Sequence, residues 1–136
     1  MSLGDHLRFL RALRHEDGMN GLAAALGEAD ARKLREIEYR YRDLSDEDLV
    51  RKLAAYYGAP VEELMWHRAR SRRALSDYLL AVHAEKRPAE LRLRTGDVLT
   101  GRVVWWDLAA IGLQAADNQP IVVVQRHAVV DWPLAG

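Results

Sequence analysis

Residues 91–106 read LRLRTGDVLTGRVVWW, and this stretch decides the fold of the C-terminal half. Its first four residues alternate between leucine and arginine, which is typical of a strand with one buried face. Thr95-Gly96-Asp97 predicts a turn, and VLTGRVVWW predicts a long second strand that contains Gly101. A glycine at that place indicates a sharp bend or a bulge in the strand.

Three more short strands are predicted after this stretch, with the sequences AAIGLQ, IVVVQ and AVVDW. Five short strands with a bent second strand favour a small closed barrel, because closure removes exposed sheet edges. The last two strands, at about 121–124 and 128–132, are strongly apolar. Because an exposed apolar edge on so small a barrel would be sticky, we expect a ring-shaped oligomer.

Toward the N-terminus the patterns are helical, and Arg87-Pro88 ends them because proline disfavours a helical residue before it. In the first helix, leucines recur at helical spacing while Arg8, Arg11 and Arg14 fall off that stripe. Ser45 followed by Asp48 predicts the N-terminal cap of the fourth helix. Helices are expected at about residues 3–13, 19–25, 30–42, 46–57 and 60–86, with Ser71 as a candidate break in the last.

These patterns predict an α+β chain made of two domains. Residues 1–70 form an all-α bundle, and residues 71–136 form a helix followed by the five-stranded barrel.

Composition excludes several classes of site. The 136 residues include no cysteine, which excludes disulfides, thiolate zinc sites and cysteine nucleophiles. No serine, histidine and acid constellation is legible, and the histidines lack metal-ligand spacing. We therefore expect neither an enzyme nor a cofactor nor a metal. With no signal peptide and no apolar run of membrane length, we expect a cytoplasmic protein that does not contact the membrane.

Residues 75–132 resemble the Hfq branch of the Sm-like RNA-binding proteins. The resemblance rests on a succession of short motifs rather than on one of them, and the SH3-like Sm barrel matches the predicted strands. The motifs are Leu75-Ser76-Asp77, Arg87-Pro88, Leu93-Arg94-Thr95-Gly96, Leu99-Thr100-Gly101, Trp106-Asp107, Ile111-Gly112-Leu113 and Arg126-His127-Ala128-Val129.

This resemblance implies a ring whose subunits pair by their fourth and fifth strands and whose helix-bearing face binds single-stranded, uridine-rich RNA. The implied RNA-binding residues are Ser76, Asp77, Lys86, Arg87, Gln125, Arg126 and His127. Arginine can neutralise a phosphate, and histidine can donate and accept hydrogen bonds. Two departures matter: Leu108 and Ala109 follow Asp107, where the family has a base-stacking aromatic residue, and Arg92, Val98 and Thr100 replace the usual residues of the adenine-binding face.

The N-terminal half resembles the Cro/CI-type helix-turn-helix fold over about residues 3–66. The resemblance rests on Leu3-Gly4, Leu22-Ala23, Leu26-Gly27, Leu34-Arg35 and Tyr57-Gly58 with their neighbours. It implies that the third helix enters the major groove of duplex DNA, with Arg32, Lys33 and Arg35 as contacts. Residues 1–65 carry 10 basic and 13 acidic residues, which argues against duplex binding by charge.

Three functions stay open at this point. The first is a non-enzymatic regulator that binds RNA through the barrel ring, supported by a basic segment at residues 66–87. The second is a DNA-binding transcriptional regulator in which the barrel only oligomerises the reader domains. The third is a structural assembly protein without nucleic-acid binding, which a net charge of zero favours.

Overall fold

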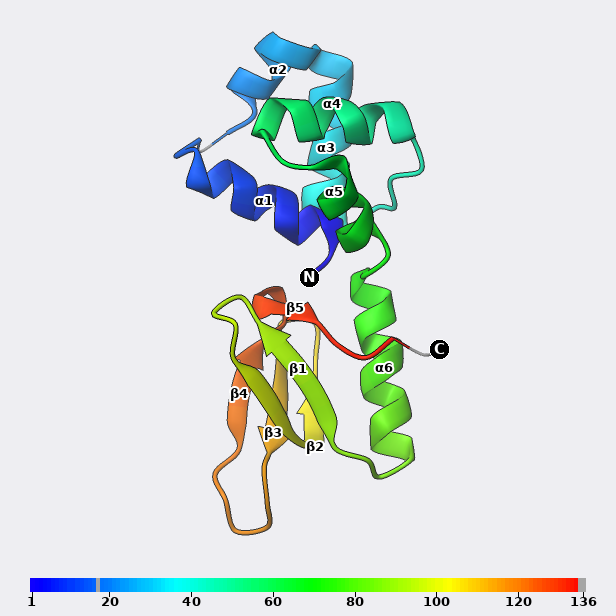
Figure 1. The fold of residues 1–136 in the computed structure, drawn as a ribbon, viewed down its shortest axis with the longest axis vertical. Helices are drawn as coiled ribbons and strands as arrows, with labels where there is room; N and C mark the ends of the chain where they lie inside the picture. The colour runs from blue at the N-terminus through cyan, green and yellow to red at the C-terminus, as the bar shows by residue number, and fades with distance from the viewer. Residues whose placement is uncertain (17, 135–136) are drawn as a thin grey trace. The chain divides into compact units, whose positions relative to one another are not determined.

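The computed structural model describes residues 1–16 and 18–134. The chain divides into two compact units, one made of Ser2–Ser71 and the other of Arg72–Gly136 together with Met1. The element order is six α-helices followed by five strands, which confirms the α+β class (Figure 1). None of the helices in the described part is long and apolar enough to cross a membrane.

The first unit consists of five helices: α1 (Leu3–Leu13), α2 (Asn20–Leu26), α3 (Glu28–Arg40), α4 (Glu47–Tyr57) and α5 (Val61–Arg68). Gly27 alone connects α2 to α3, and its φ of 100° is a conformation that favours glycine. The cap of α4 differs from the expected one: the Asp46 side chain, not that of Ser45, accepts the N–H groups of Asp48 and Leu49. An aspartate is the stronger choice there because its charge also favours the helix N-terminus.

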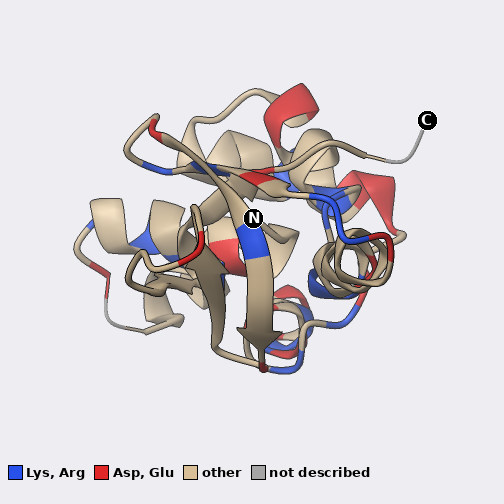
Figure 2. Cartoon of the chain, turned by 90° about the horizontal axis from the view of Figure 1, so that it is seen from below, with Lys and Arg blue, Asp and Glu red and all other residues tan. Residues whose placement is uncertain are grey.

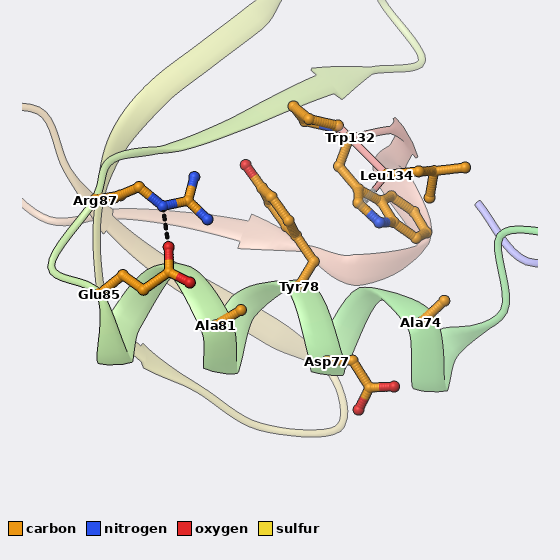
Figure 3. Close-up of a pocket in the computed structure, with 9 residues that line it drawn as sticks. Ala74, Asp77, Tyr78, Ala81, Glu85, Arg87, Trp132 and Leu134 are labelled. Carbon is orange, nitrogen blue, oxygen red and sulfur yellow. Dashed lines mark hydrogen bonds and ion pairs between the residues drawn. The ribbon is translucent and has the colours of Figure 1, made fainter. Parts of the chain in front are cut away.

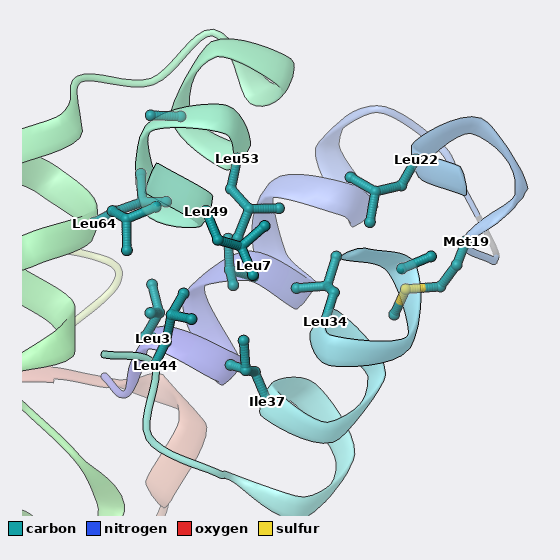
Figure 4. Close-up of a cluster of buried hydrophobic side chains, with 13 residues drawn as sticks. Leu3, Leu7, Met19, Leu22, Leu34, Ile37, Leu44, Leu49, Leu53 and Leu64 are labelled. Atoms are coloured by element: carbon teal, nitrogen blue, oxygen red, sulfur yellow. The ribbon is translucent and has the colours of Figure 1, made fainter. Parts of the chain in front are cut away.

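Leucines from every helix build the core of the first unit (Figure 4). Leu7, Leu34, Leu53 and Leu64 are fully buried within it. Arg11, expected outside the apolar stripe of its helix, is also buried and lies 2.6 Å from Glu38 Oε1 on α3. The charge is tolerated there because a buried cation needs an ionic partner, and Glu38 supplies one.

The second unit begins with α6 (Arg72–Ala84), so the helical stretch is broken after Arg68, as the candidate break near Ser71 predicted. The strands are β1 (Ala89–Leu93), β2 (Val98–Trp106), β3 (Ala110–Gln114), β4 (Val122–Gln125) and β5 (Val129–Asp131). A short 3-10 helix, η1 (Arg126–Ala128), separates β4 from β5. Leu75, Leu79 and Val82 of α6 pack with apolar residues of all five strands.

The strands form one antiparallel sheet in the order β4-β3-β2-β1-β5. The expected closure is therefore not seen: β4 and β5 remain the two edges of the sheet. The register irregularity in β2 lies between Val103 and Trp105, three residues after the predicted position. Gly101 serves close approach instead, because a Cβ there would lie 2.9 Å from the Gln114 carbonyl oxygen.

Candidate nucleic-acid interface

Arg126 lies at the junction of three segments of the second unit. Its Nη1 donates to the Asp107 carbonyl oxygen at 2.9 Å, and its Nη2 donates to the Arg72 carbonyl oxygen and to Ser76 Oγ at 2.8 Å each. Only 4% of Arg126 is exposed. The guanidinium thus joins η1, the β2–β3 turn and the first turn of α6. The structure places Arg126 as a buried support for this end of the unit, with Ser76 as one of its acceptors.

His127, the next residue, is exposed and contacts Arg94, which directly follows β1. Arg94 Nη2 lies 2.8 Å from His127 Nδ1 and 2.9 Å from the His127 carbonyl oxygen. Because a guanidinium can only donate, Nδ1 is the acceptor, and the neutral ring carries its proton on Nε2. His127 therefore presents an N–H donor. The Arg94 contact could not be predicted from local sequence patterns, since the two residues are 33 positions apart.

Asp107 organises the β2–β3 turn through its side chain. The Asp107 carboxylate accepts the N–H groups of Ala110 at 2.7 Å and of Ala109 at 2.8 Å. These two backbone hydrogen bonds, together with Arg126, lower the pKa of Asp107 below its usual value. Leu108 follows at 86% exposure, and its carbonyl accepts from Arg72 Nη1 at 3.0 Å. An exposed leucine thus stands beside the position of the family's stacking aromatic residue.

Two more of the predicted residues, Asp77 and Arg87, line a groove of about 670 Å³ along α6 (Figure 3). The C-terminal segment Trp132–Leu134 forms its other wall. Tyr78 stands inside the groove, and its hydroxyl accepts the backbone N–H of Glu90 at 2.9 Å. Arg87 is ion-paired with Glu85 (Figure 3), so its charge is partly neutralised.

The remaining predicted residues lie apart from these contacts. Lys86 is exposed and follows α6 with a left-handed φ of 56°, which ends the helix. Gln125 is exposed at the end of β4, opposite Ala110. Ser76, Gln125, Arg126 and His127 therefore share one end of the unit, whereas Lys86 and Arg87 lie beyond the far end of α6.

Residues 72–134 carry charges of both signs (Figure 2). The end of the unit around η1 holds Arg72, Arg94 and Arg126, while the Asp107 carboxylate there is occupied by backbone N–H groups. Arg72 and Arg94 place positive charge at the end around η1, where it can attract a polyanion, whereas Arg126 is buried.

The predicted DNA contacts lie on α3 in the first unit. Arg32, Lys33 and Arg35 are all exposed. Lys33 Nζ lies 3.8 Å from Asp46, an exposed pair of small energetic value. The helix begins with the acidic residues Glu28 and Asp30, which favour its N-terminus electrostatically but repel phosphate.

No group of three or more metal-ligating side chains is assembled within residues 1–16 and 18–134.

Residues 82–131 match the family model described as Hfq related. The C-terminal part of the chain is thus similar to Hfq over the segment that runs from the end of α6 to β5. Among solved structures, the crystal structure of an Hfq protein from Anabaena sp. is 27% identical, covers 43% of this chain and 92% of its own, and superposes with a TM-score of 0.36. No curated protein matches the chain.

Proposed function

We propose that this chain is a non-enzymatic regulator whose Hfq-like second unit assembles into a ring and binds single-stranded, uridine-rich RNA. The match of residues 82–131 to the Hfq-related model carries the proposal, since that family binds RNA without catalysing a reaction. The structure supports it with two features: the open sheet and the positive end of the unit around η1.

The open sheet supports assembly into a ring. β4 and β5 lie at opposite ends of the strand order, so β4 of one copy beside β5 of the next would continue the sheet. Such a head-to-tail interface closes into a ring when the rotation per copy divides a full turn. Val122 and Val123 on β4 are 49% and 60% exposed, and pairing would cover them.

Light scattering on the purified chain tests the assembly. We expect the mass of a closed oligomer, and we expect Val123→Glu to reduce it because a charge at the shared edge is left without water or a partner. Leu80→Glu is the matched control, since Leu80 is 57% exposed but lies on α6, away from either edge. A monomeric wild-type mass at micromolar concentration would refute the ring.

The RNA surface follows from the end of the unit around η1. His127 offers Nε2–H to a base carbonyl oxygen, and Arg94 orients the ring. In a ring, further acceptors and an amide group near His127 come from Ser76, Asp77 and Gln125. Positive charge toward the rim of the ring comes from Lys86 and Arg87. Arg126 acts in this proposal by positioning α6 and η1. Because Leu108 and Ala109 offer no stacking ring here, charge contributes a large share of the affinity.

Fluorescence anisotropy with labelled oligouridine tests the surface. Removal of one hydrogen bond by His127→Ala should weaken binding about two- to twelvefold, which corresponds to roughly 0.5–1.5 kcal/mol. Arg51→Ala, which removes an exposed side chain from α4 in the first unit, is the control for a change outside the proposed surface. Equal affinities for wild type and His127→Ala, with unchanged oligomeric mass, would contradict this assignment of the surface.

A further inference from the structure

The face of β2, β3 and β4 that is turned away from the core, called the outer face below, carries an exposed tryptophan, Trp105. Trp105 is not among the RNA-binding residues predicted from the sequence. Trp105 pairs with Gly112 on β3, and Gly112 pairs with Val123 on β4. Residues opposite each other in a sheet point to the same face, so these three form one row across the outer face. Trp105 is 37% exposed.

The indole of Trp105 lies flat on the sheet. A Cβ added at Gly112 would come within 3.0 Å of three atoms of the Trp105 five-membered ring, Nε1, Cε2 and Cδ1. Simultaneous approach to three atoms of one ring means that the ring covers Gly112 with its face rather than with its edge. One π face therefore packs on the glycine backbone, and Trp105 is still 37% exposed. Glycine is required at residue 112 because any side chain would displace the indole.

One arginine lies on the same face as this ring. Arg102 pairs with Gln114, two residues from Gly112 on β3, so Arg102 shares the outer face and lies about 7 Å from Trp105 along the strand. Its Nη2 also lies 3.3 Å from the exposed Asp117, a contact that solvent weakens. The outward positions of β2, β3 and β4 that the structure describes include no acidic residue.

Ring assembly would leave this surface open. Trp105 lies two strands inward from the β4 edge, which corresponds to about 10 Å at the ordinary strand spacing. A neighbouring copy that pairs with β4 would cover Val123 first.

We infer that Trp105 is a stacking site for one nucleobase of single-stranded RNA, with Arg102 beside it to meet the adjoining phosphate. The inference rests on the proposed RNA binding and adds a second contact surface to it, separate from the end around η1. Because every base has a π face, the site accepts bases with little sequence preference.

Anisotropy with oligouridine and with the same RNA carrying abasic nucleotides tests the site. Trp105→Ala should weaken binding of the intact RNA about five- to 150-fold, the equivalent of roughly 1–3 kcal/mol for one stacked base. Trp105→Phe should bind nearly as wild type does, because phenylalanine retains a π face. Val104→Ala, a change at an exposed apolar neighbour on the same strand, is the control.

The abasic RNA separates stacking from general damage to the protein. The wild type should lose affinity when bases are removed, and Trp105→Ala should lose much less. Equal loss in both proteins, or a lower oligomeric mass of Trp105→Ala, overturns the inference, and the latter result would assign the patch to contacts between copies. If the wild type binds RNA and Trp105→Ala has the same affinities as the wild type for intact and abasic RNA, this inference fails and the proposed function stands. If the wild type binds no RNA, the proposed function fails as well.

Discussion

Replacement of Arg126 by methionine should destabilise the second unit strongly, because the side chain acts inside the protein. Methionine keeps the unbranched apolar stem of arginine but is shorter by the guanidinium group and donates no hydrogen bond. The change leaves the Asp107 and Arg72 carbonyl oxygens and Ser76 Oγ without the donors that hold them at 2.8–2.9 Å.

The expected loss follows from these three contacts. A hydrogen bond from a charged donor contributes about 1.5–3 kcal/mol, but rehydration of the acceptors and relief from burying a charge offset part of the sum. We expect the free energy of unfolding to fall by about 2–4 kcal/mol, within the range of a broken buried network. With a urea m value of about 1–1.5 kcal/mol/M for so small a unit, the midpoint should fall by more than about 1 M.

Urea unfolding followed by tryptophan fluorescence measures this change, since Trp105, Trp106 and Trp132 all lie in the second unit. Arg92→Met, at an exposed arginine of β1, is the control and should alter stability by less than about 0.5 kcal/mol. If Arg126→Met unfolds like the wild type yet loses RNA affinity, Arg126 is a surface contact and the buried role is refuted.

Three further outcomes are expected. Glu38→Gln should destabilise the first unit by about 3–5 kcal/mol, because it leaves the Arg11 guanidinium buried without its counter-ion. Thermal unfolding measures this loss, and an unchanged melting temperature would contradict it. In an NMR pH series the pKa of the Asp107 carboxyl should lie below the ordinary aspartate value. The stability that this carboxylate contributes should be present above the ordinary aspartate pKa and be lost as the pH falls through the lowered one. A midpoint at the ordinary value would argue against the two backbone hydrogen bonds. If α3 reads duplex DNA, Arg32→Ala with Arg35→Ala should weaken duplex binding and leave single-stranded RNA binding intact, whereas no loss of either would make the first unit structural.

The element types could be predicted from the sequence because local patterns determine them. The leucine spacing reflects the buried face of a helix, and the alternation in residues 91–94 reflects the buried face of a strand. The predicted helices and strands are confirmed by the observed order of six helices followed by five strands. The break near Ser71 was equally visible. The predicted cap of α4, Ser45, was wrong by one residue. Ser45 and Asp46 can both accept N–H groups, and the backbone conformation selects Asp46.

Long-range features could not be predicted in the same way. Arg11 and Arg126 are charged, and charged residues are usually exposed. Both are buried here because acceptors from distant segments compensate their charges, and local patterns do not reveal such acceptors. That the sheet is open could not be predicted either. Closure depends on the bend of β2 and on the lengths of the edge strands, and residue patterns specify neither. Which face of the sheet Trp105 occupies could not be predicted either, because that depends on its pairing with Gly112 on a neighbouring strand.

The measurement that tests the central claim most directly is a titration of labelled oligouridine with the intact chain, followed by anisotropy across a salt series. Our account predicts saturable binding that weakens steeply as salt rises, because Arg94 and its cationic neighbours around η1 displace counterions from phosphate. A duplex DNA of the same length should bind more weakly at every salt concentration. Absence of saturable RNA binding at low salt, or tighter binding of the duplex, would contradict the claim that the second unit is an RNA-binding module.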